Sequence, residues 1–441
     1  MKINRSFSAR FYWRALAMAS SACLLGTSVA NAATTDVQVW YSLNPHNKQV
    51  FEKLVKQFNG DQNEVRVKLK SFDFPEAIEA ALPGTVKTKN IPHLVQLDDN
   101  RAPEEIANLS YILPLHTLLA KHPIKDAKWF LSNDNTFMHD SRGRLLAFPY
   151  MAEIPVMYYN TEAFKKAGIN PAVPARSWRG LQDQLVNLAN KATRQCPLTS
   201  DLPVSVNLEN LAAVNNQYFA SAENGLKVKG LPAFSFDVMY VRHLSVMISW
   251  VRSELMVKPA LESKSTERFA NNECGVLISE SGSMGWFKKQ RSLNFGVSGL
   301  PYYSEITKKP GNPFVDGAAF WATDGHSKAE DKATAAFLGW LAQPKNAATW
   351  YQETGFLPLT DQAFAMTDNG YYQNMGDWKN LVAAHAAKPA PTDRGFRINN
   401  YPKIKAMFRQ SMDRALSGEQ SAVVALKFAS TQAAKLMREH K

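Results

Sequence analysis

The pattern of apolar and polar residues predicts an alternation of strands and helices near the start of the chain. Residues 36–41 and 65–69 alternate as half-buried strands, and residues 91–97 form a third, mostly apolar run. Apolar residues at helical spacing predict helices over 46–59 and 75–86 between these runs. The β-α-β-α-β order predicts a doubly wound α/β lobe, whose ligands bind at the carboxyl ends of its strands.

The stretch 148–178 has the sharpest pattern in the chain. The β-branched and aromatic run Pro155–Tyr159 predicts a strand that is buried on both faces. Asn160 can cap a short helix after it, and Ser177 can cap a helix that begins at Trp178. We expect this strand to cross from the first lobe into a second one.

Later apolar runs predict strands at 274–279, 295–298 and 320–323, of which the last two are expected to return to the first lobe. Helices are predicted at 333–343, 346–355 and 418–440. We therefore expect one lobe made of 33–150 plus 275–330 and a second made of 151–274 plus 331–441. Repeated crossings would join them by a multi-strand hinge. The length of 441 residues suits such a two-lobed protein.

The first 32 residues differ in kind from the rest. Four basic residues precede a short apolar run, which ends at the small-residue site Ala30-Asn31-Ala32. This pattern is typical of a secretory signal peptide cleaved after Ala32, and it predicts a periplasmic protein. A lipidated N-terminus at Cys23 is the alternative. No later run approaches about 18 apolar residues, so the mature chain is expected to be soluble.

Charge and cysteine content narrow the class further. Removing the leader's four basic residues from the 51 leaves 47 against 39 acidic ones, a net charge of +8. No arginine-rich tract accompanies this charge, so we expect no nucleic-acid partner. The mature chain has two cysteines, Cys196 and Cys274. In an oxidising compartment they predict one disulfide, with two buried thiols as the alternative.

Motifs for catalysis, metals and cofactors are absent from the sequence. It has no Walker loop, no G-x-G-x-x-G after a strand and no H-E-x-x-H. Asp98 and Asp99 could act as a carboxylate pair, but adjacent strand residues point to opposite sides, so we expect one of them to reach a pocket. The segment Ser279–Ser283 follows a strand and opens a helix, where backbone N–H groups could bind an anion or simply cap the helix.

Three further stretches carry a resemblance that runs nearly end to end. They are Val156–Gly168, Ser265–Phe269 before Cys274, and Thr354–Pro358. On these motifs the chain resembles the family 1 extracellular solute-binding proteins of ABC importers, most closely its glycerol-phosphate-binding members. The resemblance implies a type II periplasmic-binding fold with two α/β lobes that close on a ligand. It implies no cofactor, no metal and no catalysis, and a monomer that delivers its solute to the permease subunits. It also places a cysteine pair at these two positions.

The resemblance also implies a ligand site, which we carry over one residue at a time. Trp178 would stack on the ligand, Gly317 would offer a backbone donor, and Arg397 would face a phosphate. Asp99 stands where the family has a glutamate, and Phe74 and Phe356 stand where it has tyrosines. Glu153 and Glu280 replace two serines, with Ser281 retained beside the second. The complete set implied is Phe74, Asp99, Glu153, Trp178, Glu280, Ser281, Gly317, Phe356 and Arg397.

These departures leave several hypotheses about function. The default implied by the resemblance is a receptor for sn-glycerol 3-phosphate or a glycerophosphodiester. Because a carboxylate repels a dianionic phosphate, Glu153 and Glu280 favour instead a neutral sugar or polyol, or a solute with a cationic group. A different class of protein is an exported glycoside hydrolase that uses these two glutamates, which would need them about 5 to 9.5 Å apart. A periplasmic sensor without a transport role would have the same fold.

Overall fold

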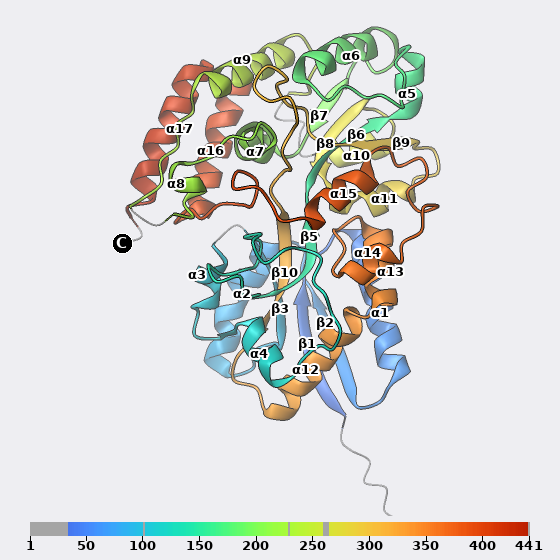
Figure 1. The fold of residues 1–441 in the computed structure, drawn as a ribbon, viewed down its shortest axis with the longest axis vertical. Helices are drawn as coiled ribbons and strands as arrows, with labels where there is room; N and C mark the ends of the chain where they lie inside the picture. Colours follow the sequence, from blue (N-terminus) through green and yellow to red (C-terminus); the bar gives the residue numbers. More distant parts are fainter. Residues whose placement is uncertain (1–33, 100–101, 228–229, 259–263, 440–441) are drawn as a thin grey trace, which may run out of the picture. The chain divides into compact units, whose positions relative to one another are not determined.

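The computed structural model describes residues 34–99, 102–227, 230–258 and 264–439, and the expected leader with Cys23 lies outside them. The described strands form two sheets (Figure 1). The first contains, in spatial order, β2 (Val65–Ser71), β1 (Thr35–Tyr41), β3 (Leu94–Asp98), β10 (Asp316–Thr323) and β4 (Ile112–Leu113), with β5 (Phe148–Glu153) also paired to β10. The second contains β7 (Leu198–Ser200), β8 (Val276–Glu280), β6 (Pro155–Asn160) and β9 (Phe295–Ser298).

The predicted β-α-β-α-β order of the first sheet is confirmed. β1 is parallel to both β2 and β3, and the chain reaches these strands through α1 (Pro45–Asp61) and α2 (Pro75–Thr88). Asn44 caps α1, since its side chain accepts a hydrogen bond from the N–H of Asn47. β10 then enters antiparallel to β3, β4 and β5, so the sheet is mixed. The carboxyl ends of β1 and β3 and the start of β10 consequently meet at one edge.

Helices from distant parts of the sequence cover the first sheet. α12 (Lys328–Leu341) packs on β1, and α13 (Pro344–Thr354) packs on α1. Ser327 and Glu330 form a reciprocal capping box at the start of α12. The ring of Trp350 in α13 stacks on Tyr150 of β5 at 4.5 Å between centroids. The C-terminal helices α12 and α13 therefore belong with the first sheet, although the sequence analysis assigned 331–441 to the second lobe.

The second sheet has its own helical cover. α9 (Val238–Arg252), α16 (Tyr401–Leu416) and α17 (Ala422–Leu436) pack on one another, α10 (Ser265–Ala270) packs on β8, and α5 (Thr161–Lys166) packs on α6 (Trp178–Lys191). The shorter helices are α3 (Pro103–Ala107), α4 (Leu115–Lys121), η1 (Ser205–Glu209), α7 (Asn210–Val214), α8 (Ser221–Asn224), η3 (Ser281–Ser283), α11 (Met284–Lys288), α14 (Asp361–Ala365) and α15 (Trp378–Ala386).

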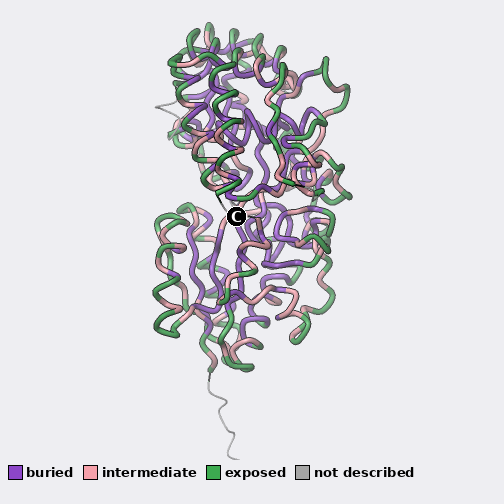
Figure 2. The backbone as a smooth tube through the Cα atoms, turned by 90° about the vertical axis from the view of Figure 1, so that its left-hand side faces the viewer, coloured by how far each residue is buried: buried purple, intermediate pink, exposed green. Residues whose placement is uncertain are grey.

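The crossing predicted in the stretch 148–178 lies between β5 and β6. β5 ends at Glu153 in the first sheet, β6 begins at Pro155 in the second, and the fully buried Ile154 lies between them. β10 runs into the first sheet from the side of the second. Most residues of β5, β6 and β10 are buried, and Figure 2 shows buried stretches of the chain running through the interior of the molecule.

The strands β8 and β9 belong to a different sheet from the one that the expected lobe boundaries imply. The strand predicted at 295–298 has the observed bounds of β9, but it pairs with β6 in the second sheet and does not return to the first. β8 also pairs with β6, so 276–298 lies with the second sheet and not with the first lobe. Alternation along a strand shows that it is buried but not which partner buries it, and this explains the error.

The predicted disulfide between Cys196 and Cys274 is present. Both cysteines are fully buried, and they precede β7 and β8, which are parallel neighbours. The bond therefore joins the starts of two paired strands that are 78 residues apart. None of the described helices combines the length and apolar character needed to cross a membrane.

Candidate functional site

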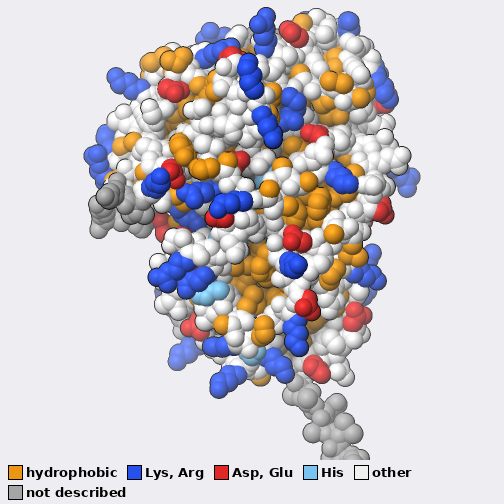
Figure 3. All heavy atoms as spheres, viewed as in Figure 1, with side chains coloured by type: hydrophobic (Ala, Val, Ile, Leu, Met, Phe, Trp, Pro, Cys, Tyr) orange, Lys and Arg blue, Asp and Glu red, His pale blue; other side chains and the backbone are white. Residues whose placement is uncertain are grey.

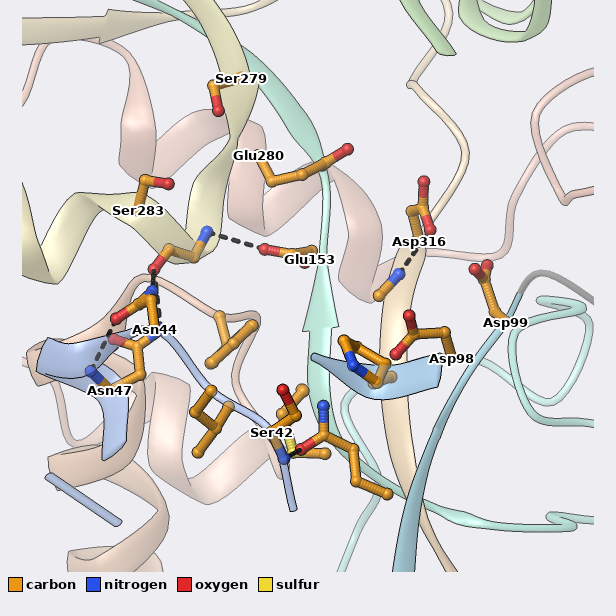
Figure 4. A pocket seen from close by; sticks show the side chains of 18 of the residues that line it. Ser42, Asn44, Asn47, Asp98, Asp99, Glu153, Ser279, Glu280, Ser283 and Asp316 are labelled. Carbon is orange, nitrogen blue, oxygen red and sulfur yellow. Dashed lines mark hydrogen bonds between the residues drawn. The ribbon is translucent and has the colours of Figure 1, made fainter. Parts of the chain in front are cut away.

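A cavity of about 450 Å³ lies where strand ends from both sheets meet (Figure 4). Parallel and mixed α/β sheets bind ligands at this edge because the loops there are free of sheet hydrogen bonds. Its lining residues are Ser42, Leu43, Asn44, Asn47, Pro75, Gln96, Asp98, Asp99, Met151, Glu153, Asp201, Ser279, Glu280, Gly282, Ser283, Asp316, Gly317, Ala318, Phe356 and Lys405.

The lining contains six carboxyl groups, and each lies at the end of a buried strand. Asp98 and Asp99 follow β3, and Asp316 begins β10. Glu153 and Glu280 are the last residues of β5 and β8, and Asp201 comes directly after β7. The six carboxyl groups belong to Asp98, Asp99, Glu153, Asp201, Glu280 and Asp316. The strong acidity of the cavity thus comes from strands of both sheets.

Asp99 and Asp316 form a coupled pair. Burial, then the neighbouring carboxylate of Asp316, raises the pKa of Asp99 well above its usual range. Burial also acts on Asp316, but Lys405, a hydrogen bond from Asp99 and the N–H of Gly317 at 2.6 Å lower its pKa overall. The two pKa values are thus shifted in opposite directions, so Asp99 is the harder of the two carboxyl groups to ionise. Burial and the carboxylate of Asp316 raise the pKa of Asp98 to about 7.

The carboxyl groups nearer the second sheet are also hard to ionise. Burial, then Asp316, raises the pKa of Glu153 to about 8, although the N–H of Gly282 donates to its Oε2 at 3.0 Å. Burial raises the pKa of Glu280 well above its usual range and that of Asp201 to about 6. Oε2 of Glu280 and Oδ1 of Asp201 are buried and accept no hydrogen bond from any described residue. Both oxygens are shielded from solvent, and their hydrogen-bonding capacity is not used by the described residues.

Among the described residues of the lining, Lys405 of α16 is the single cationic side chain. Burial opposes its charge, but Glu209, Asp316 and Asp99 together raise its pKa. Its Nζ lies 3.8 Å from Oε1 of Glu209, so part of its charge is already balanced from outside the cavity. The cavity is therefore acidic, whereas Lys and Arg side chains are spread over the outer face seen in Figure 3.

Neutral polar groups complete the wall on the side of the first sheet. The N–H of Ser42 donates to Oε1 of Gln96 at 3.0 Å, which fixes the loop after β1. Nδ2 of Asn47 donates to the carbonyl of Gly282 at 2.9 Å. The bond between Asn47 and Gly282 holds the η3 turn after β8 against α1. The two bonds leave the cavity with hydroxyl and amide groups beside its carboxylates.

Five of the nine residues implied by the sequence line this cavity: Asp99, Glu153, Glu280, Gly317 and Phe356. The backbone N–H of Gly317 was predicted to donate to the ligand, but in the structure it donates to Oδ1 of Asp316. The expectation that one of Asp98 and Asp99 reaches a pocket is wrong, since both line it. β3 ends at Asp98, so the alternation of a strand no longer applies to Asp99.

Phe74 and Trp178 lie outside the cavity lining. The side chain of Phe74 is 56% exposed before α2, and its neighbour Pro75 lines the cavity instead. Trp178 is 3% exposed, and its ring packs against His243 at 4.7 Å and Trp250 at 6.0 Å. It therefore belongs to the core of the second lobe and is no stacking platform in this structure.

Ser281 and Arg397 also lie outside the cavity lining and bond to other groups of the protein. Ser281 is fully buried, and its Oγ accepts a hydrogen bond from the N–H of Ile154 at 3.3 Å. The guanidinium of Arg397 donates to Glu104 at 2.9 Å and to the carbonyl oxygens of Thr136 and His139. The predicted phosphate clamp is thus bonded to protein acceptors away from the acidic cavity.

The sequence analysis missed most of the polar lining, above all Asp201, Asp316 and Lys405. A usable signal exists for the acids, because Asp201 and Asp316 flank apolar runs in the same way as Asp98 and Glu280. An acidic residue at the end of a buried strand is a candidate for a strand-edge site. Lys405 offers no such signal, since it is one of several lysines on an amphipathic helix.

His93, His326 and Glu330 form a separate cluster whose ligand atoms lie within 4.8 Å of one another. Nδ1 of His93 accepts a hydrogen bond from the N–H of Gln38 at 3.0 Å, so its neutral ring carries the proton on Nε2. The two imidazole rings stack at 4.0 Å with an interplanar angle of 16°. Nearly parallel rings direct their in-plane lone pairs along separate planes, so this geometry suits a stacked pair of imidazoles better than a metal centre.

Comparisons with known proteins agree with this architecture. The model of a family described as bacterial extracellular solute-binding protein matches residues 53–384. The chain is 27% identical over 437 residues to the sn-glycerol-3-phosphate-binding periplasmic protein UgpB of Escherichia coli strain K12, covering 97% of each chain. The UgpB of Shigella dysenteriae serotype 1 gives the same values.

Solved structures share the fold at lower identity. UgpB of Mycobacterium tuberculosis in complex with glycerophosphocholine superposes with a TM-score of 0.72 at 15% identity, over 92% of this chain and 99% of that one. Maltose-bound MalE3 of T. maritima gives a TM-score of 0.72 at 15% identity, over 91% and 100%. These neighbours show the two-lobed periplasmic-binding fold.

Proposed function

Because this chain belongs to the bacterial extracellular solute-binding protein family, we propose that it captures a small polar solute carrying a positive charge, in the cavity between its two sheets. Such proteins deliver solutes to the membrane permease of an ABC importer and do not transform them. The glycoside hydrolase hypothesis built on Glu153 and Glu280 is therefore dropped. The two glutamates serve binding.

The observation that carries the proposal is the excess of six carboxyl groups over one lysine in the lining. Burying a carboxylate without a partner is costly, so several of these groups hold protons when the cavity contains no cation. An ammonium group provides donors and charge at the same time. It would pair with the unsatisfied oxygens of Glu280 and Asp201 and lower the pKa values that burial has raised.

A phosphate group fits the same surroundings poorly. The relatives named for sn-glycerol 3-phosphate suggest that ligand, but a dianion would face Asp98, Glu153 and Glu280 here. Arg397, which the sequence suggested as its partner, already pairs with Glu104. A neutral sugar is less well supported than a cation, since Phe356 is the one aromatic residue among the lining residues.

Export and assembly belong to the same proposal. The basic and apolar pattern of 1–32 supports a leader cleaved after Ala32 and a periplasmic location. Membership of the solute-binding protein family supports a monomeric receptor that meets its permease as a single copy.

Calorimetry on the mature chain tests the proposed ligand class. Ethanolamine, choline and 1,4-diaminobutane are compared with glycerol, glucose, glycerophosphocholine and sn-glycerol 3-phosphate at pH 7.5. We expect micromolar or tighter binding for at least one cationic compound, and no comparable binding for sn-glycerol 3-phosphate. Tight binding of sn-glycerol 3-phosphate or of glucose alone would overturn the proposal.

Two variants test the site. Glu280→Gln keeps the shape of the side chain but removes its charge, and it should weaken cation binding by about 10- to 100-fold, as expected for the loss of a charge-assisted hydrogen bond. Glu267→Gln on α10 makes the same change at an exposed position outside the cavity and should leave the affinity unchanged. Equal affinities for the two variants would contradict the assignment of the site.

A further inference from the structure

A second cavity of about 610 Å³ adjoins the first. The two share three lining residues, Asp201, Asp316 and Lys405. Beyond these the second cavity is lined by Glu76, Glu79, Leu202, Pro203, Val204, Ser205, Asn400, Pro402, Lys403, Ala406 and Arg409. The second cavity therefore lies directly beyond the carboxyl cluster, between the first turn of α2 and the first turns of α16.

The second cavity differs from the first in chemistry. Leu202, Pro203 and Val204 give it an apolar wall at the start of η1, and Ala406 adds to it from α16. Its acidic residues on α2 face basic residues on α16, so charges of both signs are present in similar number. A cationic head is thus favoured in the first cavity, and an extended part with little net charge is favoured in the second.

Two of the three described basic residues of the second cavity, Lys405 and Arg409, already have acidic partners, and the third, Lys403, is exposed. Lys405 lies 3.8 Å from Glu209, and Nε of Arg409 lies 3.3 Å from both carboxylate oxygens of Asp413. A dedicated anion site would keep such groups directed at the cavity. This arrangement argues against an anionic group at the far end of the solute.

We infer that the solute is an extended aliphatic amine, with its ammonium head among the carboxyl groups of the first cavity and its chain along Leu202, Val204 and Ala406 of the second. The inference rests on the proposed function, since the same site receives the head. Ligand pockets of about 300–1,000 Å³ usually hold molecules larger than a three-carbon solute, and the two adjoining cavities together fall in this range or above it.

A homologous series of amines tests the inference in the unmodified mature chain. Ethylamine, butylamine, hexylamine and octylamine share one head and differ only in chain length. Each methylene that enters the second cavity should tighten binding about two- to fourfold, as expected from burial of apolar surface. We expect the Kd to fall from ethylamine to hexylamine, measured by calorimetry at one pH and one salt concentration.

A large side chain placed in the second cavity should block the binding of the alkyl chain, and the same side chain placed elsewhere serves as the control. Ala406→Trp places a large ring in this cavity, while Gln410→Trp adds the same ring on α16, at an exposed residue that lines neither cavity. The ratio of the ethylamine Kd to the hexylamine Kd should drop at least tenfold in Ala406→Trp and remain as in the wild type in Gln410→Trp. Circular dichroism and the melting temperature check that both variants fold.

The possible failures can be told apart. If ethylamine binds but longer amines bind no better, and Ala406→Trp has no effect on the ratio, the extended solute is wrong while the cationic receptor stands. If no amine of any length binds, the proposed function itself is wrong. A ratio that drops equally in both tryptophan variants would also overturn the placement of the chain in the second cavity.

Discussion

The carboxylate of Glu153 accepts a hydrogen bond from the backbone N–H of Gly282 at 3.0 Å. Glu153 ends β5 of the first sheet, and Gly282 lies in η3 after β8 of the second. A Cβ at Gly282 would lie 2.4 Å from Oε2 of Glu153 and 2.8 Å from the ring of Phe356, so a larger residue here would displace the carboxylate or the ring. The bond joins the two sheets directly beneath the cavity and uses one carboxylate oxygen of the site.

Glu153→Gln should stabilise the ligand-free protein while weakening its binding of cations. The pKa of Glu153 is raised to about 8, so folding at pH 8 requires either a buried charge or a retained proton. Glutamine removes that cost and its amide oxygen can still accept from Gly282. We expect about 1–3 kcal/mol of added stability at pH 8, measured by urea unfolding.

Asp183→Asn, on the outer side of α6, serves as the control because the residue is exposed and lines neither cavity. It should change stability by less than about 0.5 kcal/mol, as is usual for surface positions. A loss of stability in Glu153→Gln would show that the ionised carboxylate stabilises the fold, and the acidic cavity would then need a different explanation.

Ser177 and Trp178 show which features could be predicted from the sequence and which could not. The cap was predicted correctly, since Oγ of Ser177 accepts from the N–H of Gly180 at 3.1 Å. Capping depends on neighbouring residues alone, so it can be predicted from a short stretch. Which way Trp178 points depends on His243 and Trp250, which lie far away in the sequence, and its role was predicted wrongly.

The residues of the candidate site also divide into those that the sequence could predict and those that it could not. Glu153 and Glu280 were found through the family resemblance, because they stand at positions where the family has serines. Asp201, Asp316 and Lys405 come from three other parts of the chain, and only the pairing of the sheets brings them together. Arg397 has the expected residue type in the expected segment, but its direction is set by acceptors in the loop at 136–139.

The stability of the ligand-free protein should fall as the pH rises from 6.5 to 8.5. Asp98 and Glu153 have pKa values of about 7 and about 8 in the folded state, above those of ordinary carboxyl groups. The folded state therefore binds more protons than the unfolded state, and stability is lost as the pH rises through these values. The two groups together predict a loss of about 2–3 kcal/mol over this window.

Cation binding should follow the opposite trend, because ionised carboxylates attract an ammonium group. Melting temperatures at several pH values, with and without a saturating amine, measure both effects. The histidines His93 and His243 are held neutral by burial and do not titrate in this window, since their pKa values are lowered to about 4 and about 3. Ligand-free stability that stays level or rises up to pH 8.5 would refute the assignment of raised pKa values.

Arg397→Met should destabilise the fold without acting on the ligand site. The guanidinium bonds Glu104 and the carbonyl oxygens of Thr136 and His139, and the side chain is 17% exposed. Removing it leaves a carboxylate and two carbonyl groups without this partner. We expect a loss of about 2–4 kcal/mol in urea unfolding, close to that of other broken, largely buried ion pairs.

Arg414→Met is the matched control, because Arg414 pairs with Glu419 at an exposed position. Its loss should be below about 1 kcal/mol, as for most surface pairs. The cation affinity should be the same in both variants. If Arg397→Met instead abolished binding of a phosphate-bearing solute and left stability intact, the anion clamp suggested by the sequence would be restored.

The disulfide should contribute to stability and not to binding. Cys196 and Cys274 precede the parallel neighbours β7 and β8, and these strands lead into Asp201 and Glu280 of the cavity. Closing a loop of 78 residues restricts the unfolded chain, and the double variant C196S/C274S should lose about 3–5 kcal/mol in urea unfolding. The hydrogen bonds between β7 and β8 remain in the folded state, so the Kd for an amine should change less than about twofold. A much weaker Kd in a fully folded double variant would mean that the bond sets the positions of Asp201 and Glu280, and its role would then be functional as well as structural.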